Sequence, residues 1–391
     1  MKKICVFTGT RAEYGLLKPL IRKIKEDDEL TLQLIVSGSH LSPEFGMTIN
    51  EIKNDGFEIN EKIEMILSSD SSVGIIKSMG VGLIGYADAL ERLKPDLIII
   101  LGDRYEALAI ATSAMIARIP IAHIHGGEIT EGAYDDSIRH AITKMSYIHF
   151  SSTNEYRNRI IQMGEEPERV YNVGAIGLDS IFSLDLLKRE ELIEHISFDI
   201  QDKYFLVTYH PTTLEERSSE EQFHNLLKAL DMFKEYKVVF TKANADTDGR
   251  IINEMIDEYV AKNKQRCVQF TSMGQLRYLS AMKYCTLVIG NSSSGILEAP
   301  SFNVPTVNIG NRQKGRIAAE SVFDCNVEYE DIVNTINNSL EFKSENNKII
   351  NPYYNGNTTD KILSIIKNYV LNNKIENMKK FFDLDVNRAS K

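Results

Sequence analysis

The chain has 391 residues, 43% hydrophobic and 26% charged, which is enough for two or three domains whose cores need no disulfide or structural metal. Acidic side chains outnumber basic ones by 55 to 45, and the net charge of −10 argues against a broad surface for nucleic acid or anionic lipid. No run approaches the roughly 18 apolar residues of a membrane span, and the apolar stretch before Gly9 is too short for a secretion signal, so we expect a cytoplasmic protein.

Short apolar runs followed by helical patterns recur along the chain, which is the rhythm of βα units. Runs such as Leu97–Leu101 are apolar throughout, as is typical of strands covered by helices on both faces of a parallel sheet. We therefore predict an α/β protein with two doubly wound sheets. The expected strands are Lys3–Thr8, Thr31–Ser37, Leu97–Leu101 and Ile121–His125 in the first half, and Tyr204–Tyr209, Lys237–Thr241, Val268–Phe270, Leu287–Gly290 and Thr306–Ile309 in the second.

The strand rhythm lapses between Gly174 and Gln201, and this lapse marks the expected domain boundary. We predict a first domain over residues 1–175 and a second over 176–355. The remaining segment, 356–391, is amphipathic and rich in lysine, and we expect a helix there that packs back on the first domain. Two facing domains of this kind would bind a ligand in the cleft between the carboxyl ends of their strands.

Charged residues follow three expected strands of the first domain. Arg11 lies in a glycine turn after the first strand, where it could meet an anion, or it is an ordinary solvated arginine. Asp103 and Arg104 follow Leu97–Leu101, although an aspartate there is also a common helix cap. His125 and Glu128 follow the next strand, and Asp135 begins the helix after it. Because consecutive loops meet at one sheet edge, we expect the ionisable clusters at 102–104, 123–128 and 135–140 to converge in space.

Two patterns in this half suggest a metal or dinucleotide site, and we reject both. Gly80-Val81-Gly82-Leu83-Ile84-Gly85 matches GxGxxG, but it lies inside the helical stretch Val73–Leu90 instead of opening a helix, so its glycines serve helix packing. His123 and His125 would share one face of a strand, yet no cysteine pair or HExxH accompanies them. The four cysteines lie far apart and read as core residues. We expect no metal and no cofactor.

Polar residues follow two strands of the second domain in the same way. His210 comes after Tyr204–Tyr209 beside a proline, where it can meet a phosphate, shuttle a proton or simply form a turn. Ser292 and Ser293 open a helix with hydroxyls and backbone N–H groups that suit an anion. Glu298 lies one turn further, where it can accept hydrogen bonds from ribose or favour the helix dipole. Arg312 adds a cation after the next strand.

Several of these motifs, in this order, resemble the hydrolysing UDP-N-acetylglucosamine 2-epimerases of sialic acid biosynthesis. The motifs are Gly9-Thr10-Arg11-Ala12-Glu13-Tyr14, Gly102-Asp103-Arg104-Tyr105-Glu106, His123-Ile124-His125-Gly126-Gly127-Glu128, Asp136-Ser137-Ile138-Arg139-His140-Ala141-Ile142-Thr143-Lys144, Gly290-Asn291-Ser292-Ser293-Ser294-Gly295 and Arg312-Gln313-Lys314-Gly315-Arg316. The resemblance implies a GT-B-like fold, with two Rossmann-like domains, parallel sheets and an interdomain cleft. It also implies a homo-oligomer, either a dimer or a tetramer.

The resemblance implies roles for individual residues. Asp103, Glu128 and Asp135 correspond to acid/base groups, and some members of the family have glutamate where this chain has His125, so His125 either transfers protons or orients groups for Glu128. The residues implied to contact the diphosphate are Arg11, His210, Ser292 and Ser293; Glu298 is implied for the ribose, and Arg104, Asn244 and Arg312 for the surroundings of the ligand.

The implied reaction converts UDP-N-acetylglucosamine and water into N-acetylmannosamine and UDP through elimination of UDP and hydration of a glycal. The same reaction on nucleotide-linked N,N'-diacetylbacillosamine is an open alternative, because the diphosphate motifs do not report C4 and C6 of the sugar. A GT-B glycosyltransferase or an inactive nucleotide-sugar sensor would have no need of the Asp103, His125 and Asp135 set.

Overall fold

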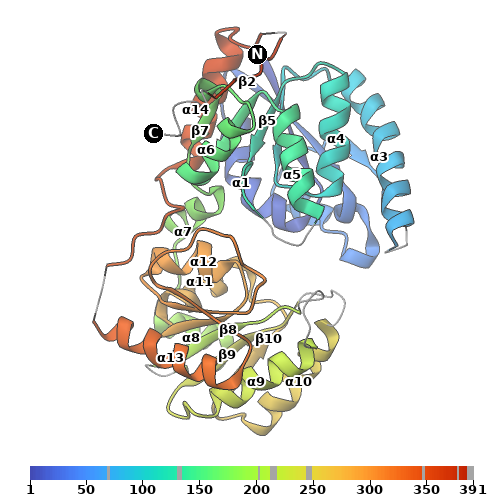
Figure 1. Cartoon of the computed structure of the whole chain (residues 1–391). Helices are drawn as coiled ribbons and strands as arrows, with labels where there is room; N and C mark the ends of the chain where they lie inside the picture. Colours follow the sequence, from blue (N-terminus) through green and yellow to red (C-terminus); the bar gives the residue numbers. More distant parts are fainter. Residues whose placement is uncertain are drawn as a thin grey trace. The chain divides into compact units, whose positions relative to one another are not determined.

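The computed structural model describes residues 1–67, 71–129, 134–200, 203–211, 218–243, 249–345, 348–376 and 378–384 (Figure 1). These residues form two compact units. The first contains residues 1–129, 134–179 and 355–384, and the second contains the described residues of Ser180–Tyr354. Each unit is built on its own sheet.

The first unit holds a seven-stranded parallel sheet in the order β3-β2-β1-β4-β5-β6-β7. The strand order reverses between β1 and β4, and this switch point is where doubly wound sheets place ligands. The strands are β1 (Lys2–Thr8), β2 (Leu30–Ser37), β3 (Glu61–Ile63), β4 (Leu97–Leu101), β5 (Ile121–Ile124), β6 (Ile148–Ser151) and β7 (Val170–Asn172). The four strands predicted from the sequence are present, and β3, β6 and β7 were not predicted.

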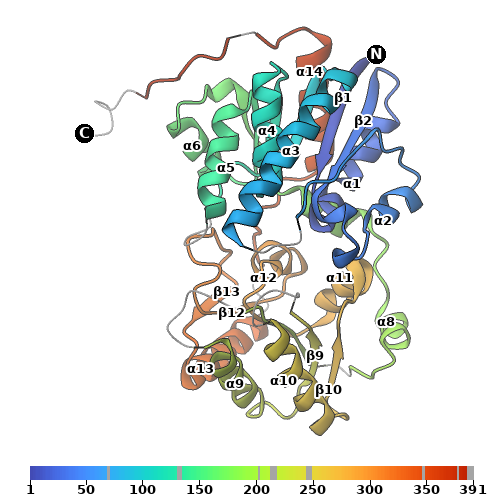
Figure 2. The ribbon, with the colours of Figure 1, turned by 90° about the vertical axis from the view of Figure 1, so that its right-hand side faces the viewer.

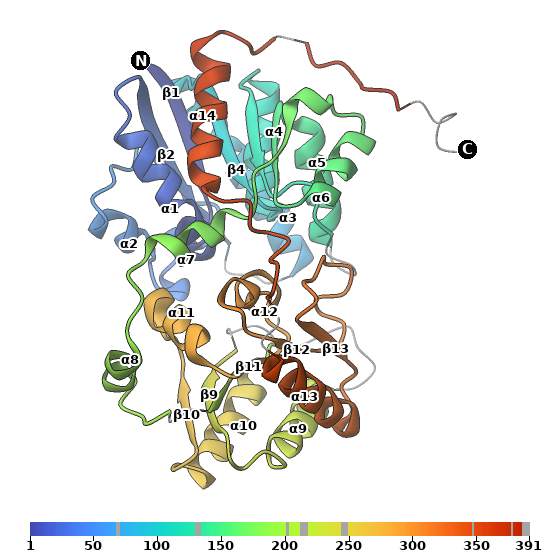
Figure 3. The same ribbon diagram turned by 90° about the vertical axis from the view of Figure 1, so that its left-hand side faces the viewer.

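Helices cover both faces of this sheet. On one face, α3 (Ser72–Leu93), α4 (Tyr105–Ile116) and α5 (Tyr134–Met145) lie side by side over one core cluster (Figure 2). On the other face, α1 (Arg11–Lys25) and α2 (Ile49–Asn54) share a second core with the late helix α14 (Thr358–Leu371), through residues such as Leu17 and Ile366 (Figure 3). α6 (Asn154–Gln162) packs on β6 and β7.

The glycines of the rejected GxGxxG pattern lie in the middle of α3. A Cβ on Gly85 would come within 2.6 Å of the Ile63 side chain, and one on Gly82 within 3.0 Å of Met65, so both permit close packing against β3 and the chain that follows it. Gly80 faces open space. Among the described residues α3 alone is long and apolar enough to cross a membrane. One such helix is weak evidence for a membrane span, because helices that pack on the core of a soluble protein share these properties.

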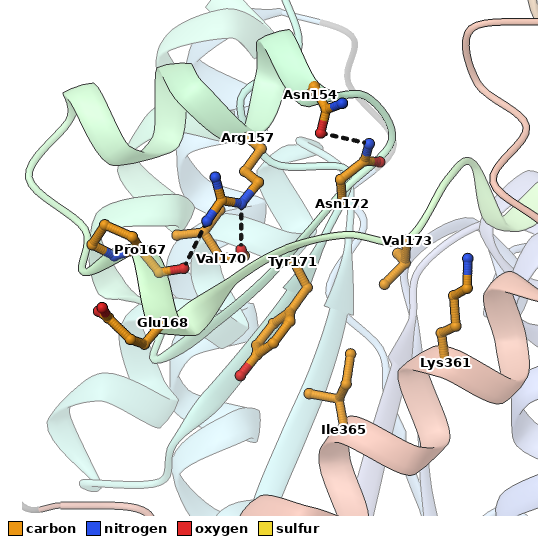
Figure 4. A pocket seen from close by; sticks show the side chains of 10 residues that line it. All are labelled: Asn154, Arg157, Pro167, Glu168, Val170, Tyr171, Asn172, Val173, Lys361 and Ile365. Atoms are coloured by element: carbon orange, nitrogen blue, oxygen red, sulfur yellow. Dashed lines mark hydrogen bonds between the residues drawn. The ribbon is translucent and has the colours of Figure 1, made fainter.

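The β7 edge of this sheet is covered by side chains. A groove of about 390 Å³ runs along it, and Arg157 in that groove donates to the carbonyl oxygens of Val170 and Pro167 at 2.8 and 3.1 Å (Figure 4). Asn355 donates to the Asn172 carbonyl. These bonds occupy backbone acceptors that an edge strand would otherwise expose.

The second unit holds a six-stranded parallel sheet in the order β10-β9-β8-β11-β12-β13, and its order reverses between β8 and β11. The strands are β8 (Tyr204–Thr208), β9 (Lys237–Thr241), β10 (Cys267–Phe270), β11 (Leu287–Gly290), β12 (Thr306–Ile309) and β13 (Val322–Cys325). All but β13 were predicted. The helices are α7 (Asp179–Ser183), α8 (Arg189–Ile196), α9 (Ser219–Leu230), α10 (Gly249–Lys262), α11 (Gly274–Tyr284), α12 (Ser294–Leu297) and α13 (Tyr329–Ser344), and two core clusters cover the two faces.

Candidate active site

The carboxyl end of β4 carries the central ion pair of the first unit. Gly102 takes a left-handed φ of 77° as the chain leaves the strand, and the Asp103 carboxylate then forms an ion pair with the buried Arg139 of α5. Burial raises the pKa of Asp135, and the negative charge of Asp103 raises it further, while Arg104 and Arg139 oppose the shift. Two carboxylates and two guanidiniums therefore act on one another at the switch point, as the sequence predicts for Asp103, Arg104 and Asp135.

Arg11 lies at the same edge but has another partner. Thr10 caps α1 and Glu13 completes the capping box, which fixes the turn after β1. The Arg11 Nε lies 3.0 Å from a carboxylate oxygen of Glu51 on α2, and both side chains are exposed. An anion bound by Arg11 would have to compete with Glu51.

His125 and Glu128 lie close together after β5. His125 Nδ1 is 3.5 Å from Glu128 Oε1, and the backbone N–H of Ile176 donates to His125 Nε2 at 3.3 Å. Because Nε2 accepts, Nδ1 carries the proton and faces the carboxylate. Glu128 also accepts a 2.7 Å hydrogen bond from Ser152. The imidazole is thus oriented by the backbone on one side and turned toward Glu128 on the other.

The expectation that His123 and His125 share a strand face is wrong. β5 ends at Ile124, and His125 adopts a left-handed φ of 64°, which turns it away from the strand pattern. His123 is fully buried, with Nε2 2.8 Å from the Gly102 carbonyl and Nδ1 3.1 Å from Thr143 Oγ1. Burial lowers the pKa of His123 to about 3, so this histidine is a neutral core residue that joins β5 to the end of β4.

The described residues contain no group of three or more histidine, cysteine, aspartate and glutamate side chains arranged to hold a metal ion.

The carboxyl ends of β8 and β11 meet in the second unit through Asn291. The buried Asn291 side chain accepts from the His210 backbone N–H at 2.7 Å and donates to the His210 carbonyl at 2.8 Å. Its own carbonyl accepts from Arg312 and Gln313, each at 3.0 Å. His210 and Arg312 are therefore held on either side of the turn that presents Ser292 and Ser293.

This turn depends on glycine. Gly290 has a φ of 136°, and a Cβ there would lie 1.9 Å from the Thr208 carbonyl, so β11 approaches β8 too closely for a side chain. The sequence predicts Glu298 inside the helix after the turn, but α12 has four residues and Glu298 is the residue that caps its carboxyl end. Burial raises the pKa of Glu298 to about 7, and its hydrogen bond with Ser294 opposes the shift. Asn244 lies outside the described residues.

Three structural partners were missed in the sequence, namely Arg139, Asn291 and Gln313. Each of them lies within a motif, but its partner lies far along the chain or on the next loop. The only signal for these contacts in the sequence is the residue's position, one turn into a helix or directly after a strand. A cavity of about 290 Å³ opens beside Gln313. The other residues that line it are Ile296, Asn308, Gly310, Asn311, Lys314, Gly315, Arg316, Ala318, Asp324, Cys325 and Asn326.

Comparison with known proteins agrees with the resemblance. A protein of Campylobacter jejuni, GDP/UDP-N,N'-diacetylbacillosamine 2-epimerase (hydrolyzing), is 43% identical over 342 residues, which cover 88% of this chain and 89% of that protein. Polysialic acid biosynthesis protein P7 of Escherichia coli is 40% identical over 98% of both chains. The crystal structure of UDP-GlcNAc 2-epimerase from Neisseria meningitidis bound to UDP-GlcNAc matches with a TM-score of 0.78 at 17% identity, covering 94% of this chain and 100% of that one.

These matches confirm the predicted fold class, a GT-B-like α/β protein with two Rossmann-like parallel sheets. A family model described as UDP-N-acetylglucosamine 2-epimerase matches residues 22–367. The chain therefore belongs to the UDP-N-acetylglucosamine 2-epimerase family.

Proposed function

We propose that this protein is a hydrolysing 2-epimerase that converts a UDP- or GDP-linked 2-acetamido sugar and water into the nucleoside diphosphate and the free 2-epimer, within sialic or nonulosonic acid biosynthesis. The observation that carries the proposal is the set of Asp103, Asp135, Arg104 and Arg139 at the β1–β4 switch point of a member of this family. A glycosyltransferase or a sensor has no use for paired carboxylates of this kind.

The first half of the proposed reaction is elimination. Asp103 or Asp135 removes the proton from C2 of the sugar while the C1–O bond to UDP breaks, and the electrons of the C–H bond form the C1–C2 double bond of a glycal. Since the C2 proton is weakly acidic, stabilisation of the leaving diphosphate must supply much of the rate. Of the residues implied to contact the diphosphate, His210, Ser292 and Ser293 of the second unit have the donors for this task, whereas Arg11 is paired with Glu51. Arg312, implied for the surroundings of the ligand, adds a cation, and Glu298 has the acceptor for ribose.

The second half is hydration. Water adds to C1, and C2 receives a proton on the face opposite to the one that lost it, which inverts C2 and yields the free sugar. A second acid/base group is needed for that face, and Glu128 is our candidate. The orientation of His125 supports a role in holding Glu128 over a role as proton donor, because one ring nitrogen accepts from the backbone and the other faces the carboxylate.

Two sugars fit the proposal. UDP-N-acetylglucosamine, which would yield N-acetylmannosamine, is supported by the family description and by the polysialic acid relative. UDP- or GDP-N,N'-diacetylbacillosamine is supported about equally by the relative at 43% identity. In both cases we propose that one nucleotide sugar engages residues of both domains, 1–175 and 176–355, in a cytoplasmic homo-oligomer, with no metal or cofactor.

Incubation with each nucleotide sugar in deuterated water, followed by NMR of the products, tests the proposal. We expect free UDP, a manno-configured sugar and one deuterium at C2. The sugar that turns over faster identifies the substrate. Release of UDP without deuterium at C2 contradicts the elimination and indicates simple hydrolysis or glycosyl transfer, and binding without turnover indicates a sensor.

A further inference from the structure

Glu106 is a fully buried carboxylate that the proposed chemistry leaves unused. It lies in the first turn of α4, directly after the motif that carries Asp103. Its two oxygens accept from Nε and Nη2 of Arg104 at 3.2 and 3.3 Å, which is a two-pronged contact with the guanidinium. Arg104 is 47% exposed, so one side of this cation is held from beneath while the other remains at the surface.

The backbone around Glu106 is shaped to hold the carboxylate in place. Gly38 has a φ of 59°, and a Cβ there would lie 2.6 Å from the Gly9 carbonyl and 3.2 Å from Glu106 Oε1. The loops after β1 and β2 therefore close on each other and on the carboxylate, and a side chain at Gly38 would clash with the Gly9 backbone and crowd Glu106. Burial of a charged group costs folding free energy unless the charge is paired. Arg104 pairs with the Glu106 carboxylate.

Arg104 also interacts electrostatically with a second buried acid, Glu13. Glu13 accepts from the backbone N–H groups of Gly9 and Thr10 at 2.7 and 3.3 Å. The pKa of Glu13 is raised to about 7, chiefly by burial and also by the charge of Glu106, while the hydrogen bond from Gly9 and the charge of Arg104 oppose the shift. Arg104 thus lies within electrostatic reach of two buried acids.

Glu106 and Arg104 also act on Asp135, which is one of the two proposed bases. Besides burial, four charges act on the pKa of Asp135: Asp103 and Glu106 raise it, while Arg104 and Arg139 lower it. A change at Glu106 therefore reaches Asp135 both through the position of Arg104 and through its own charge.

We propose that Glu106 is a positioning residue that fixes the guanidinium of Arg104 toward an oxygen acceptor of the substrate. An arginine side chain held in this way loses less conformational entropy when the substrate binds and reacts, because part of that loss is already met in the free protein. This inference rests on the proposed function.

A double-mutant cycle on the full-length protein tests it, using Glu106→Gln, Arg104→Gln and the double variant. A glutamine can accept only one of the two hydrogen bonds from Arg104, and its amide places a donor against a donor. We expect Glu106→Gln to lower kcat about tenfold or more while KM changes less than fivefold. In the Arg104→Gln background the same change should cost less than twofold, because its effect passes through the arginine.

The pH profile supplies a readout that a purely structural role would not move. Loss of the Glu106 charge lowers the pKa of Asp135, whereas displacement of the Arg104 guanidinium raises it. The acid limb of kcat/KM should therefore shift by different amounts when Glu106→Gln is made in the wild type and in Arg104→Gln, because only in the wild type does the change also move the guanidinium. The matched control is Glu61→Gln, which removes a two-pronged glutamate partner of Arg92, with both contacts at 2.8 Å, and should leave kcat and the pH profile unchanged.

The outcomes separate this inference from the function it rests on. In an active enzyme, losses in kcat that multiply independently, or an acid limb that shifts equally in the wild-type and Arg104→Gln backgrounds, overturn the positioning role alone. A wild-type protein that releases no UDP from either sugar overturns the proposed function and the positioning role with it. Should Glu106→Gln fail to fold, a kcat for Arg104→Gln equal to that of the wild type overturns the inference by itself.

Discussion

Asp103 is the residue whose removal should separate binding from chemistry. Its carboxylate pairs with Arg139 in the first unit, whereas the proposed diphosphate contacts belong to the second. We expect Asp103→Asn to keep UDP affinity within about tenfold, roughly 1.4 kcal/mol, while turnover collapses. Calorimetric titration with UDP and the NMR assay measure the two quantities. Asp136→Asn, one residue after Asp135 and facing His140, is the control that should stay active. Equal loss of binding and turnover in Asp103→Asn would indicate a structural role.

His125 and Glu128 should respond differently to substitution. If the imidazole only orients the carboxylate, His125→Asn, which tolerates the left-handed φ of 64°, should retain activity within about tenfold. Glu128→Gln removes the proton carrier itself and should cost about a hundredfold or more, the usual contribution of a general acid or base. Steady-state kinetics compare the two. The reverse order would assign proton transfer to His125.

Residue types in this site could be predicted from the sequence, but their partners and conformations could not. Convergence of Asp103, Arg104 and Asp135 followed from strands that end at one edge. The pairing of Asp103 with Arg139 depends on how α5 packs, and the turn at His125 depends on one φ angle that neighbouring residues do not specify. The roles of the candidate residues remain predictions.

At the scale of elements, the segment after α14 is tied to the end of α5. Lys379 donates to the carbonyl oxygens of Lys144 and Ser146 at 2.7 Å and pairs with the fully buried Glu165 at 2.7 Å. Phe381 packs on Gly164, where any Cβ would clash with its ring. Lys379 therefore caps the carboxyl end of the helix that carries Asp135 and Arg139.

We expect Lys379→Met to lower the free energy of unfolding by about 1–3 kcal/mol, because it leaves the Lys144 and Ser146 carbonyls at the end of α5, and part of a buried carboxylate, without their donor. Lys380→Met, a change at the exposed neighbouring lysine, should stay within about 0.5 kcal/mol. Urea denaturation of both variants measures the difference. Equal stability of the two would show that the segment contributes nothing to α5.

Glu165 should make part of the stability depend on pH. Burial alone would raise its pKa, but hydrogen bonds and charges from His149, Lys144 and Lys379 outweigh burial and hold it at about 2, against an ordinary 4.5. Because the folded pKa is the lower one, the stabilisation is present above pH 4.5 and is lost as pH falls toward 2. The difference in free energy of unfolding between the wild type and Glu165→Gln, up to about 3 kcal/mol, should therefore become smaller below pH 4.5. Denaturation of both proteins at a series of pH values measures this difference. A difference that stays constant would contradict this pairing.

The strands that sequence patterns missed have a common reason. β3 and β7 have three residues each, and β6 and β13 have four, of which several are polar, so none provides a long apolar run. Their positions are set by the sheet that they join. Long strands such as β4, and α3 with its apolar spacing, were predicted because burial on both faces or on one face leaves a clear period in the sequence.

At the scale of the whole molecule, α3 has an apolar face that the described residues leave exposed. Its inner face contributes Tyr86, Ala89 and Leu90 to the core. On the outer face Ile76 and Ile84 are 68% and 72% exposed, and the other exposed positions of this stripe are Val73, Gly80, Leu83 and Ala87. Val73, Ile76, Gly80, Leu83 and Ala87 follow the alternating three- and four-residue spacing of a helix that packs on another helix, and Gly80 in the middle permits close approach.

A second copy of this chain is the partner that we expect on this face, since two identical helices can cross at Gly80 about a twofold axis and cover each other's isoleucines. Replacement of Ile84 by aspartate should raise the dissociation constant of the dimer at least a hundredfold, because it buries an unpaired charge on both sides of the axis. Sedimentation at a series of concentrations measures the constant. Met232→Asp, a change at another exposed apolar residue, which lies in the second unit, should leave the dimer intact. A wild-type protein that is monomeric would contradict this assignment. So would a protein that binds lipid vesicles by means of α3 and sediments with them. For α3 to enter the bilayer in that case, Tyr86 and Leu90 would have to leave the core.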